Sequence, residues 1–260
     1  MSISIKKIDT ESPKCYDSAV LKQLLTGLSE LVYPPHCLVC QKHLPSTSPT
    51  EGLCPHCRNV LKPNLPPFCP KCSRHLRNAA RPQCLECAKF NPQFDFAWAA
   101  CLYQDPLKNL IYQFKYNQRT YLRKMFIQLI ADFIETYNLD IGQFDLIAPI
   151  PLFSSRLRER GYNQAQLMAE LIAEKYRIEL SLNGLLRIRD TGHQTLLNEK
   201  ERWTNIHGAF RIKYPAKFSG KNVLIVDDLL TTGATASEAA RVLKNAKAKT
   251  IGVLTLAITV

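Results

Sequence analysis

VLIVDDLLTTGAT, residues 223–235, is the stretch that decides the fold of this chain of 260 residues. Its first four residues predict a strand buried on both faces, and the small and hydroxyl-bearing residues that end it predict a turn into a helix over 233–246. A strand that leads through a short turn into a helix is the repeating unit of α/β folds with parallel sheets. Ligands of such folds bind at the carboxyl ends of the strands, where this motif carries its polar residues.

The same alternation of strand and helix continues along the chain from about residue 95 to its end. Apolar runs predict buried strands at 97–103, 145–151 and 251–258. Periodic apolar residues predict helices from about 105 to 137 and over 155–176, and a separate helix at 17–33 that stops before two prolines. The sequence therefore predicts an α/β fold, with a mostly parallel sheet and helices on both faces.

Asp227, Asp228 and the turn that follows form a candidate site for a phosphorylated sugar. The turn consists of Thr231, Thr232, Gly233, Ala234 and Thr235. Its N–H groups and hydroxyls lie at a helix N-terminus, which favours a phosphate monoester. The two carboxylates can accept hydrogen bonds from two ribose hydroxyls, directly or through Mg²⁺ carried by a diphosphate. The competing interpretation is that the strand simply ends at a solvated, capped helix without a ligand. The complete thirteen-residue pattern favours the ribose 5-phosphate site over this interpretation.

Eight of the ten cysteines form four CxxC pairs. The pairs are Cys37 with Cys40, Cys54 with Cys57, Cys69 with Cys72, and Cys84 with Cys87. Two pairs supply the four thiolates of one tetrahedral site, so sequential pairing predicts two structural zinc sites. Iron in a four-thiolate cage, disulfides and a redox CxxC remain alternatives. Cys15 and Cys101 have no such partner, and we interpret the histidines near the pairs as ordinary surface residues.

Lys and Arg outnumber Asp and Glu by 34 to 22, which gives a net charge of +12. An excess of this size favours anionic partners, namely phosphates, nucleic acid or acidic lipid. The first fifteen residues lack the apolar region of a signal peptide, and no apolar stretch is long enough to span a bilayer. We therefore expect a cytoplasmic protein without membrane insertion, whose attachment to the inner membrane, if any, is made through partners.

Residues 108–124 form a candidate surface for single-stranded DNA, because they combine cations with aromatic rings and contain no Asp or Glu. The cations are Lys108, Lys115, Arg119, Arg123 and Lys124, and the rings are Tyr112, Phe114, Tyr116 and Tyr121. Cations can follow the phosphates of a strand while exposed rings stack on its bases. The alternative is an ordinary helix that buries Leu110, Ile111 and Phe114 and leaves its charges in solvent.

The motif at 223–235 resembles the phosphoribosyl diphosphate motif of type I phosphoribosyltransferases. Two further stretches, PIPLFSSRLRERGYNQA at 149–165 and TGHQTLLNEKERWTNIHGAF at 191–210, are similar to signature stretches of the ComF family of competence proteins. That family also carries an N-terminal double zinc ribbon, and the resemblance covers roughly residues 34–260; His193 departs from the proline expected there. We expect a helical extension at 1–33, a double zinc ribbon at 34–93 and a phosphoribosyltransferase-like domain at 94–260.

The resemblance also implies roles for residues outside the 223–235 motif. It implies a diphosphate loop at residues 152–156, with Ser154, Ser155 and Arg156 as phosphate contacts, and Arg160 as a further anion contact. It implies a mobile loop over 187–209 that closes on the ligand. The contributors expected from that loop are Arg189, Gln194, Lys200 and Arg202. In a transfer reaction, Asp227 and Asp228 would stabilise positive charge on the ribose, while Mg²⁺, the diphosphate loop and the loop cations, with Arg202 among them, take up the diphosphate.

Two functions are compatible with this sequence. The family resemblance favours a role in natural transformation, in which the protein handles incoming single-stranded DNA beside a translocase and a recombination mediator and binds phosphoribosyl diphosphate or a nucleotide. The alternative is a metabolic phosphoribosyltransferase that transfers ribose 5-phosphate to an unidentified base or amine. No element recognisable in the sequence reads an acceptor, so the sequence leaves catalytic turnover open.

Overall fold

The structure is a computed structural model of the chain that describes residues 36–44, 52–78, 80–192 and 198–260. The helix expected at 17–33, Cys15, His193 and Gln194 lie outside the described residues. No helix in the described ranges is both long enough and apolar enough to cross a membrane.

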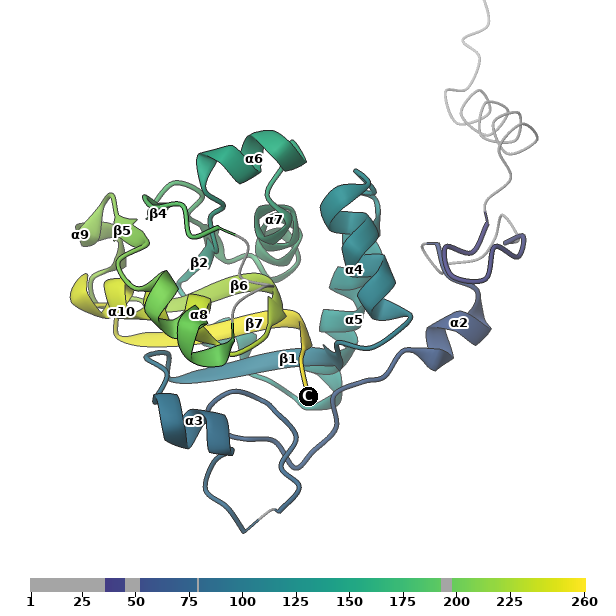
Figure 1. The fold of residues 1–260 in the computed structure, drawn as a ribbon, viewed down its shortest axis with the longest axis horizontal. Coiled ribbons are helices and arrows are strands. Elements are labelled where there is room, and N and C mark those ends of the chain that lie inside the picture. Colours follow the sequence, from purple (N-terminus) through teal and green to yellow (C-terminus); the bar gives the residue numbers. More distant parts are fainter. Residues whose placement is uncertain (1–35, 45–51, 79, 193–197) are drawn as a thin grey trace, which may run out of the picture.

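A five-stranded parallel sheet with the strand order β1-β7-β6-β2-β3 forms the centre of the fold (Figure 1). Its strands are β1 (Phe96–Leu102), β2 (Leu146–Pro149), β3 (Glu179–Leu180), β6 (Asn222–Leu230) and β7 (Thr250–Ile258). The two longest strands, β6 and β7, pair from Asn222 opposite Thr250 to Leu230 opposite Ile258. The strands predicted at 97–103, 145–151 and 251–258 are thus confirmed, and so is the mostly parallel α/β fold.

Helices cover both faces of the sheet, as its unbroken apolar strands require. Because side chains alternate along a strand, Leu224 and Val226 of β6 belong to one apolar cluster, with residues of α5 (Leu122–Thr136) and α7 (Gln164–Tyr176). Val223 and Ile225 belong to a second cluster, with residues of α10 (Ala234–Asn245). This arrangement leaves the carboxyl ends of the strands as the edge on which the polar motif lies.

Each of the two long helices expected from the sequence is divided in the structure. The stretch 105–137 consists of α4 (Leu107–Tyr116) and α5, with Gln118 between them in a left-handed conformation at φ 54°. The stretch 155–176 consists of α6 (Ser154–Arg160) and α7. Gly161, at φ 80°, ends α6, and the side chain of Asn163 caps α7 by accepting a hydrogen bond from the amide of Ala165. Local capping residues therefore outweigh the continuous apolar periodicity.

The region expected as a mobile loop, 187–209, contains regular structure in its described part. Strands β4 (Leu185–Arg187) and β5 (Phe210–Ile212) form a separate antiparallel pair, and α8 (Glu199–Ile206) lies between them in the chain. Asn198 and Glu201 form a reciprocal capping box at the start of α8, and Trp203 stacks on Phe90 with ring centroids 5.0 Å apart. The helix α8 is therefore anchored, which corrects the expectation of one long loop. Two short helices lie elsewhere in the chain, η1 (Ile141–Gln143) before β2 and α9 (Pro215–Phe218) after β5.

Two cysteine-rich segments precede the sheet in the chain. The first carries α2 (Pro55–Val60) and lies to one side of the sheet, whereas the second carries α3 (Leu85–Phe90) and lies along β1 (Figure 1). The fully buried Asn64 donates hydrogen bonds to the carbonyls of Ser73, at 2.7 Å, and Ala99, at 3.1 Å, and so ties the second segment to β1. The second segment is therefore part of the packed body of the protein.

Candidate functional site

A cavity of about 380 Å³ opens at the carboxyl ends of β6 and β2, and we call it the strand-end cavity. Its lining includes two carboxylates and five cations. These residues are Asp227, Asp228, Lys115, Arg156, Arg160, Arg187 and Arg202. The cations come from several different elements, and they outnumber the acids, so the cavity favours an anionic ligand that carries more than one charge.

The turn at 231–235 joins β6 to α10 as the sequence predicts. Gly233 is the N-cap of α10 and has φ 80°, a conformation that glycine adopts without strain. The first N–H groups of α10 have no intrahelical acceptor, and such groups at a helix N-terminus can donate to an anion. Thr231 and Thr235 line the strand-end cavity, whereas Thr232 lines a neighbouring cavity and Ala234 is buried.

Asp227 and Asp228 lie near the end of β6. Asp227 is half-buried and Asp228 is buried, although carboxylates at the end of a strand are usually exposed to solvent. The Asp228 residue is 6% exposed, and its carboxylate is 2.8 Å from the ammonium nitrogen of Lys115. A carboxylate oxygen of Asp227 accepts a hydrogen bond from the amide of Asp228 at 2.9 Å. Burial, followed by the charge of Asp228, raises the pKa of Asp227 to about 7. The pair therefore combines a carboxylate that is paired with a lysine and a carboxyl group, that of Asp227, that titrates near neutral pH.

Lys115 is a site residue that sequence reasoning assigned to a different surface. The sequence predicts an exposed cation of the DNA-binding stretch, whereas the structure places Lys115 in the strand-end cavity, paired with Asp228. Burial lowers the pKa of Lys115, but the Asp228 carboxylate outweighs burial and the pKa is raised overall. Helical spacing is the sequence signal for this position. Lys115 follows the buried Leu107 and Ile111 by eight and four residues, so it lies on the same face of the helix as these two residues.

The segment after β2 brings two of the residues that we expect as anion contacts to the strand-end cavity. Arg156 and Arg160 line the strand-end cavity, and the Arg160 guanidinium lies over the ring of Tyr116 at 5.0 Å. Among the residues that the structure describes, Ser154 and Ser155 are absent from the cavity lining. Ser154 is exposed at the start of α6, and the Ser155 hydroxyl donates to Asp190 at 2.8 Å.

The residues expected to contribute from the 187–209 region lie in different places, and not all of them line the strand-end cavity. Arg202 of α8 lines the strand-end cavity. Arg189 donates to the backbone carbonyls of Asn205 and His207 at 2.5 and 2.7 Å, so its guanidinium holds the ends of this region together. Lys200 is exposed on α8 and is absent from the lining of the strand-end cavity in the described chain. Arg187, which the sequence analysis did not single out, does line it, and burial lowers the pKa of its guanidinium.

The eight CxxC cysteines form two groups with sequential pairing, as predicted. One group consists of Cys37, Cys40, Cys54 and Cys57, and the other of Cys69, Cys72, Cys84 and Cys87. Neighbouring sulfur atoms lie 3.7 Å apart in the first group and 3.5 Å apart in the second. Four sulfurs around a tetrahedral zinc ion at about 2.3 Å are about 3.8 Å apart, whereas a disulfide requires about 2.05 Å.

The surroundings of the sulfur atoms also suit a metal. Backbone N–H groups point at the sulfurs, from Cys57 to Cys54 at 3.4 Å and from Cys87 to Cys84 at 3.5 Å, and such donors stabilise thiolate charge. No histidine belongs to either group in the described part of the chain, and Cys101 is buried apart from them in β1. Both groups therefore fit structural zinc sites that protein thiolates close completely.

Known proteins resemble this chain in both halves and over most of its length. A family described as "Double zinc ribbon domain" matches residues 28–92, and one described as "Phosphoribosyl transferase domain" matches residues 160–258. Competence protein F of Haemophilus influenzae is 30% identical over 226 residues, which cover 85% of this chain and 96% of that protein.

Two further relatives carry related names. DNA utilization protein YhgH of Salmonella typhimurium is 28% identical over 227 residues, covering 86% of this chain and 96% of that protein. Competence protein ComFC of Bacillus subtilis is 31% identical over 157 residues, covering 59% of this chain and 60% of that protein. The double ribbon, the phosphoribosyltransferase domain and these relatives together show that the chain belongs to the ComF family of competence proteins.

Proposed function

We propose that this protein handles single-stranded DNA during DNA uptake, and that its strand-end cavity binds phosphoribosyl diphosphate or a nucleotide. The arrangement of the strand-end cavity is the observation that carries the proposal. It joins an N–H-rich turn, a pair of carboxylates and a set of guanidinium groups at one edge of a parallel sheet. The names of the relatives, which refer to competence and DNA utilization, support the DNA part.

In this proposal, each part of the cavity meets one part of the ligand. The 5-phosphate lies on the 231–235 turn at the N-terminus of α10. The ribose hydroxyls donate to Asp227 and Asp228, and the further phosphate groups contact Arg156, Arg160 and Arg187. The carboxylates are also suitable oxygen ligands for Mg²⁺, which would neutralise part of the charge of a diphosphate.

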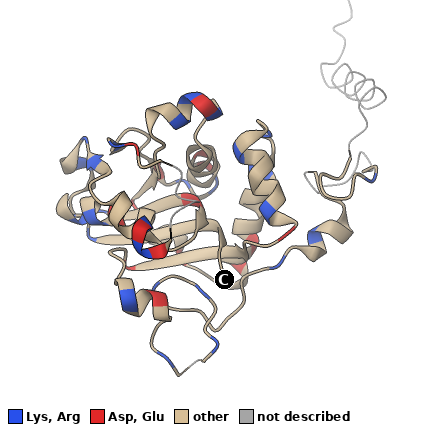
Figure 2. Ribbon diagram, in the orientation of Figure 1, with Lys and Arg blue, Asp and Glu red and all other residues tan. Residues whose placement is uncertain are grey.

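The DNA part of the proposal uses an exposed surface beside the strand-end cavity, which we call the α4–α5 surface. It consists of the exposed residues Lys108, Tyr112, Tyr116, Arg119, Tyr121 and Lys124 and the half-buried Arg123. The three tyrosines are 57%, 43% and 48% exposed, while Leu110, Ile111 and Phe114 are buried on the other side of α4. Figure 2 shows cations and no acid along α4. Tyr116 belongs both to this surface and to the strand-end cavity, so a bound strand could reach the site.

A metabolic phosphoribosyl transfer is the second candidate, and one observation favours it. A neighbouring cavity adjoins the strand-end cavity and shares Arg202, Thr231 and Thr259 with it, which leaves space for an acceptor molecule. The test is release of diphosphate from phosphoribosyl diphosphate and Mg²⁺ in the presence of bases and amines. Sustained turnover with one acceptor would replace the DNA role by this one.

Isothermal titration calorimetry with ribose 5-phosphate, and with phosphoribosyl diphosphate and Mg²⁺, tests the site directly. We expect binding by the unmodified protein and its loss in Asp227→Asn. The matched control is Asp105→Asn, which changes an exposed carboxylate outside the strand-end cavity. If the unmodified protein binds neither ligand, the proposed site is wrong; if it binds them but no single-stranded DNA, the DNA part is wrong.

A further inference from the structure

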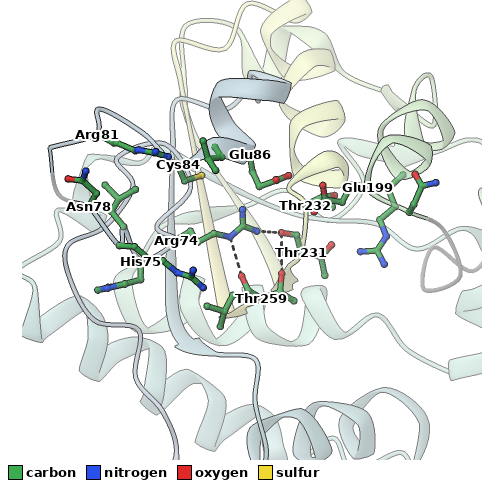
Figure 3. A pocket seen from close by; sticks show the side chains of 16 residues that line it. Arg74, His75, Asn78, Arg81, Cys84, Glu86, Glu199, Thr231, Thr232 and Thr259 are labelled. Carbon is green, nitrogen blue, oxygen red and sulfur yellow. Dashed lines mark hydrogen bonds between the residues drawn. The ribbon is translucent and has the colours of Figure 1, made fainter.

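A second and larger cavity, of about 940 Å³, lies between the second cysteine-rich segment and α8 (Figure 3). We call it the ribbon cavity. Its lining comes from residues 74–86, from the start of α8 and from the ends of β6 and β7. Because it shares Arg202, Thr231 and Thr259 with the strand-end cavity, the two cavities meet at the 231–235 turn. Its volume is at the upper end of the range of about 300 to 1,000 Å³ for ligand pockets.

The wall that the cysteine-rich segment contributes is fixed to the strand ends by Arg74. The Arg74 guanidinium donates to the carbonyl of Thr231 at 2.7 Å and to the carbonyl of Thr259 at 3.2 Å, as the dashed lines in Figure 3 show. Thr231 is the first residue of the turn on which we place a phosphate. The ribbon cavity is therefore held at a defined position relative to the proposed phosphate site.

The lining of the ribbon cavity combines cations with apolar surface. It contains four arginines, Arg74, Arg77, Arg81 and Arg202, and two acids, Glu86 and Glu199. Arg77 and Arg81 are exposed, and Leu85 and Val260 also line the cavity with 68% and 72% exposure. Guanidinium groups bind phosphates and stack on bases, and exposed apolar side chains can cover the face of a base. This combination matches a nucleotide better than it matches a small inorganic anion.

Glu86 adds a specific feature to this lining. One of its carboxylate oxygens, Oε2, is buried and has no hydrogen-bond partner among the described residues. A buried acceptor without a donor is costly, and such groups are uncommon in native proteins. In Figure 3 the Glu86 carboxylate extends from α3 toward the side of the cavity where Thr232 lies. Oε2 is covered by protein atoms, so a ligand N–H reaches it only after the Glu86 side chain turns toward the cavity that it lines, and the amino group of a nucleobase is such a donor.

We infer that the ribbon cavity binds a nucleotide of single-stranded DNA whose amino-bearing base donates to Glu86 and whose phosphates contact Arg77 and Arg81. The inference rests on the proposed function, because the strand would continue from this cavity to the 231–235 turn. The second cysteine-rich segment is then one wall of the nucleic-acid site as well as a metal-stabilised module. Base selection at Glu86 would favour cytosine over uracil, which carries a carbonyl where cytosine carries its amino group.

Fluorescence anisotropy with labelled oligonucleotides of twelve deoxycytidines or twelve deoxyuridines tests the role of Glu86. The unmodified protein should bind the deoxycytidine strand on the order of tenfold more tightly. Glu86→Gln keeps the shape of the side chain but replaces the carboxylate by an amide, so we expect this preference to fall to about twofold or less. Affinity for ribose 5-phosphate should not change.

The two arginines are tested by Arg77→Ala with Arg81→Ala. This double variant should weaken binding of both strands alike and reduce the salt dependence of affinity by about two counterions. The control is Lys175→Ala with Lys249→Ala, which removes the same charge from two exposed lysines. Both lie at the amino ends of the strands, Lys175 near the end of α7 and Lys249 just before β7. The control variant should bind both strands as the unmodified protein does.

Equal affinity of the unmodified protein for the two strands, or an equal effect of Glu86→Gln on both, would overturn the assignment of Glu86 to a base. Deoxycytidine monophosphate that competes as strongly as the strand, with the same dependence on Glu86, would overturn the assignment to a strand. Ribose 5-phosphate binding without any oligonucleotide binding would refute this inference and leave the strand-end site intact. Absence of ribose 5-phosphate binding would instead refute the proposed site.

Discussion

The ammonium nitrogen of Lys115 lies 2.8 Å from a carboxylate oxygen of Asp228, with the two side chains 19% and 9% exposed. The pair joins the last turn of α4 to the end of β6 inside the strand-end cavity. Asp228 is thereby compensated within the protein, whereas the adjacent Asp227 belongs to none of the ion pairs between described residues. A ribose or Mg²⁺ that bound at Asp228 would have to use the other carboxylate oxygen, or else share this one with Lys115 or displace the lysine.

Lys115→Met should destabilise the protein by about 3 kcal/mol at pH 8, because it leaves a buried carboxylate without its cation. Denaturant unfolding at pH 8, with zinc present, measures the effect. The double variant Lys115→Met with Asp228→Asn should recover most of the stability. Equal stability of Lys115→Met and the unmodified protein at pH 8 would show that the pair contributes nothing.

Asp227→Asn should stabilise the protein at pH 8 while it removes ligand binding. The pKa of Asp227 is about 7 in the folded protein, against 3.8 for an unperturbed aspartate, so folding takes up a proton between these values. Stability from this group is therefore greatest below about pH 4, falls as the pH rises through this window and stays low above pH 7. At about 1.4 kcal/mol per pH unit, removal of the charge gains up to about 4 kcal/mol at pH 8.

Thermal unfolding from pH 5 to pH 8 measures this gain. The difference between Asp227→Asn and the unmodified protein should grow with pH, whereas Asp105→Asn should show no such trend. The Asn side chain retains an oxygen that can accept the hydrogen bond from the Asp228 amide, so the local backbone is preserved. A difference that shrinks as the pH rises would contradict the assignment of a raised pKa.

The parts of the fold that the sequence predicts are those with local signals. The buried apolar runs of β6 and β7, the glycine at φ 80° in the 231–235 turn and the four CxxC pairs each depend on residues close together in the chain. The breaks at Gly161 and Gln118 are also local, but the apolar periodicity continues across them and conceals them. A single residue in a left-handed conformation is therefore enough to divide a helix whose apolar periodicity is unbroken.

The composition of the site depends more on long-range contacts, which leave no local pattern. Lys115 is 113 residues before Asp228 in the chain, and only the packing of α4 against the sheet brings the two together. Arg187 and the ribbon cavity likewise depend on how β4, α8 and the cysteine-rich segment surround the strand ends. Ser154 and Ser155 have a local signal, because they lie in a signature stretch. They are nevertheless absent from the cavity lining in the described chain.

The protein should contain about two zinc ions per chain that differ in how readily a chelator removes them. In the second group all four cysteines are buried, and they share an apolar cluster with Phe94 and Ala97 of the sheet region. In the first group Cys40 is exposed. A colorimetric chelator assay should therefore show one fast and one slow phase of about one zinc each.

Substitutions at the cysteines separate the two groups further. Cys72→Ser should lower the thermal stability of the phosphoribosyltransferase domain, because its ligand group packs against that domain. Cys40→Ser should release the fast zinc and have a smaller effect on that domain. Metal analysis and calorimetry of both variants provide the measurement. Release of both ions in a single phase, or no effect of Cys72→Ser on unfolding, would contradict this assignment.

The α4–α5 surface should contribute to single-stranded DNA binding through the cations that are not engaged with the strand-end cavity. Lys108→Ala, Arg119→Ala and Arg123→Ala together should weaken binding and reduce the salt dependence by about three counterions, because three phosphate contacts are lost. Tyr112→Ala should cost roughly 1 to 3 kcal/mol if the ring stacks on a base. Lys115 is left unchanged, since its loss would disturb Asp228.

Fluorescence anisotropy of a labelled oligonucleotide at several salt concentrations measures this contribution, with Lys175→Ala, Lys213→Ala and Lys249→Ala as the charge-matched control. A variant that combines the α4–α5 changes with Arg77→Ala and Arg81→Ala then shows whether one DNA strand contacts both surfaces or whether each surface binds a separate strand. If a single strand runs from the ribbon cavity past the strand-end cavity to α4, both sets of changes should lower the affinity for a long oligonucleotide, and a short one should respond to one set alone. Affinity that does not respond to the α4–α5 changes would exclude this surface and leave the ribbon cavity as the proposed DNA site.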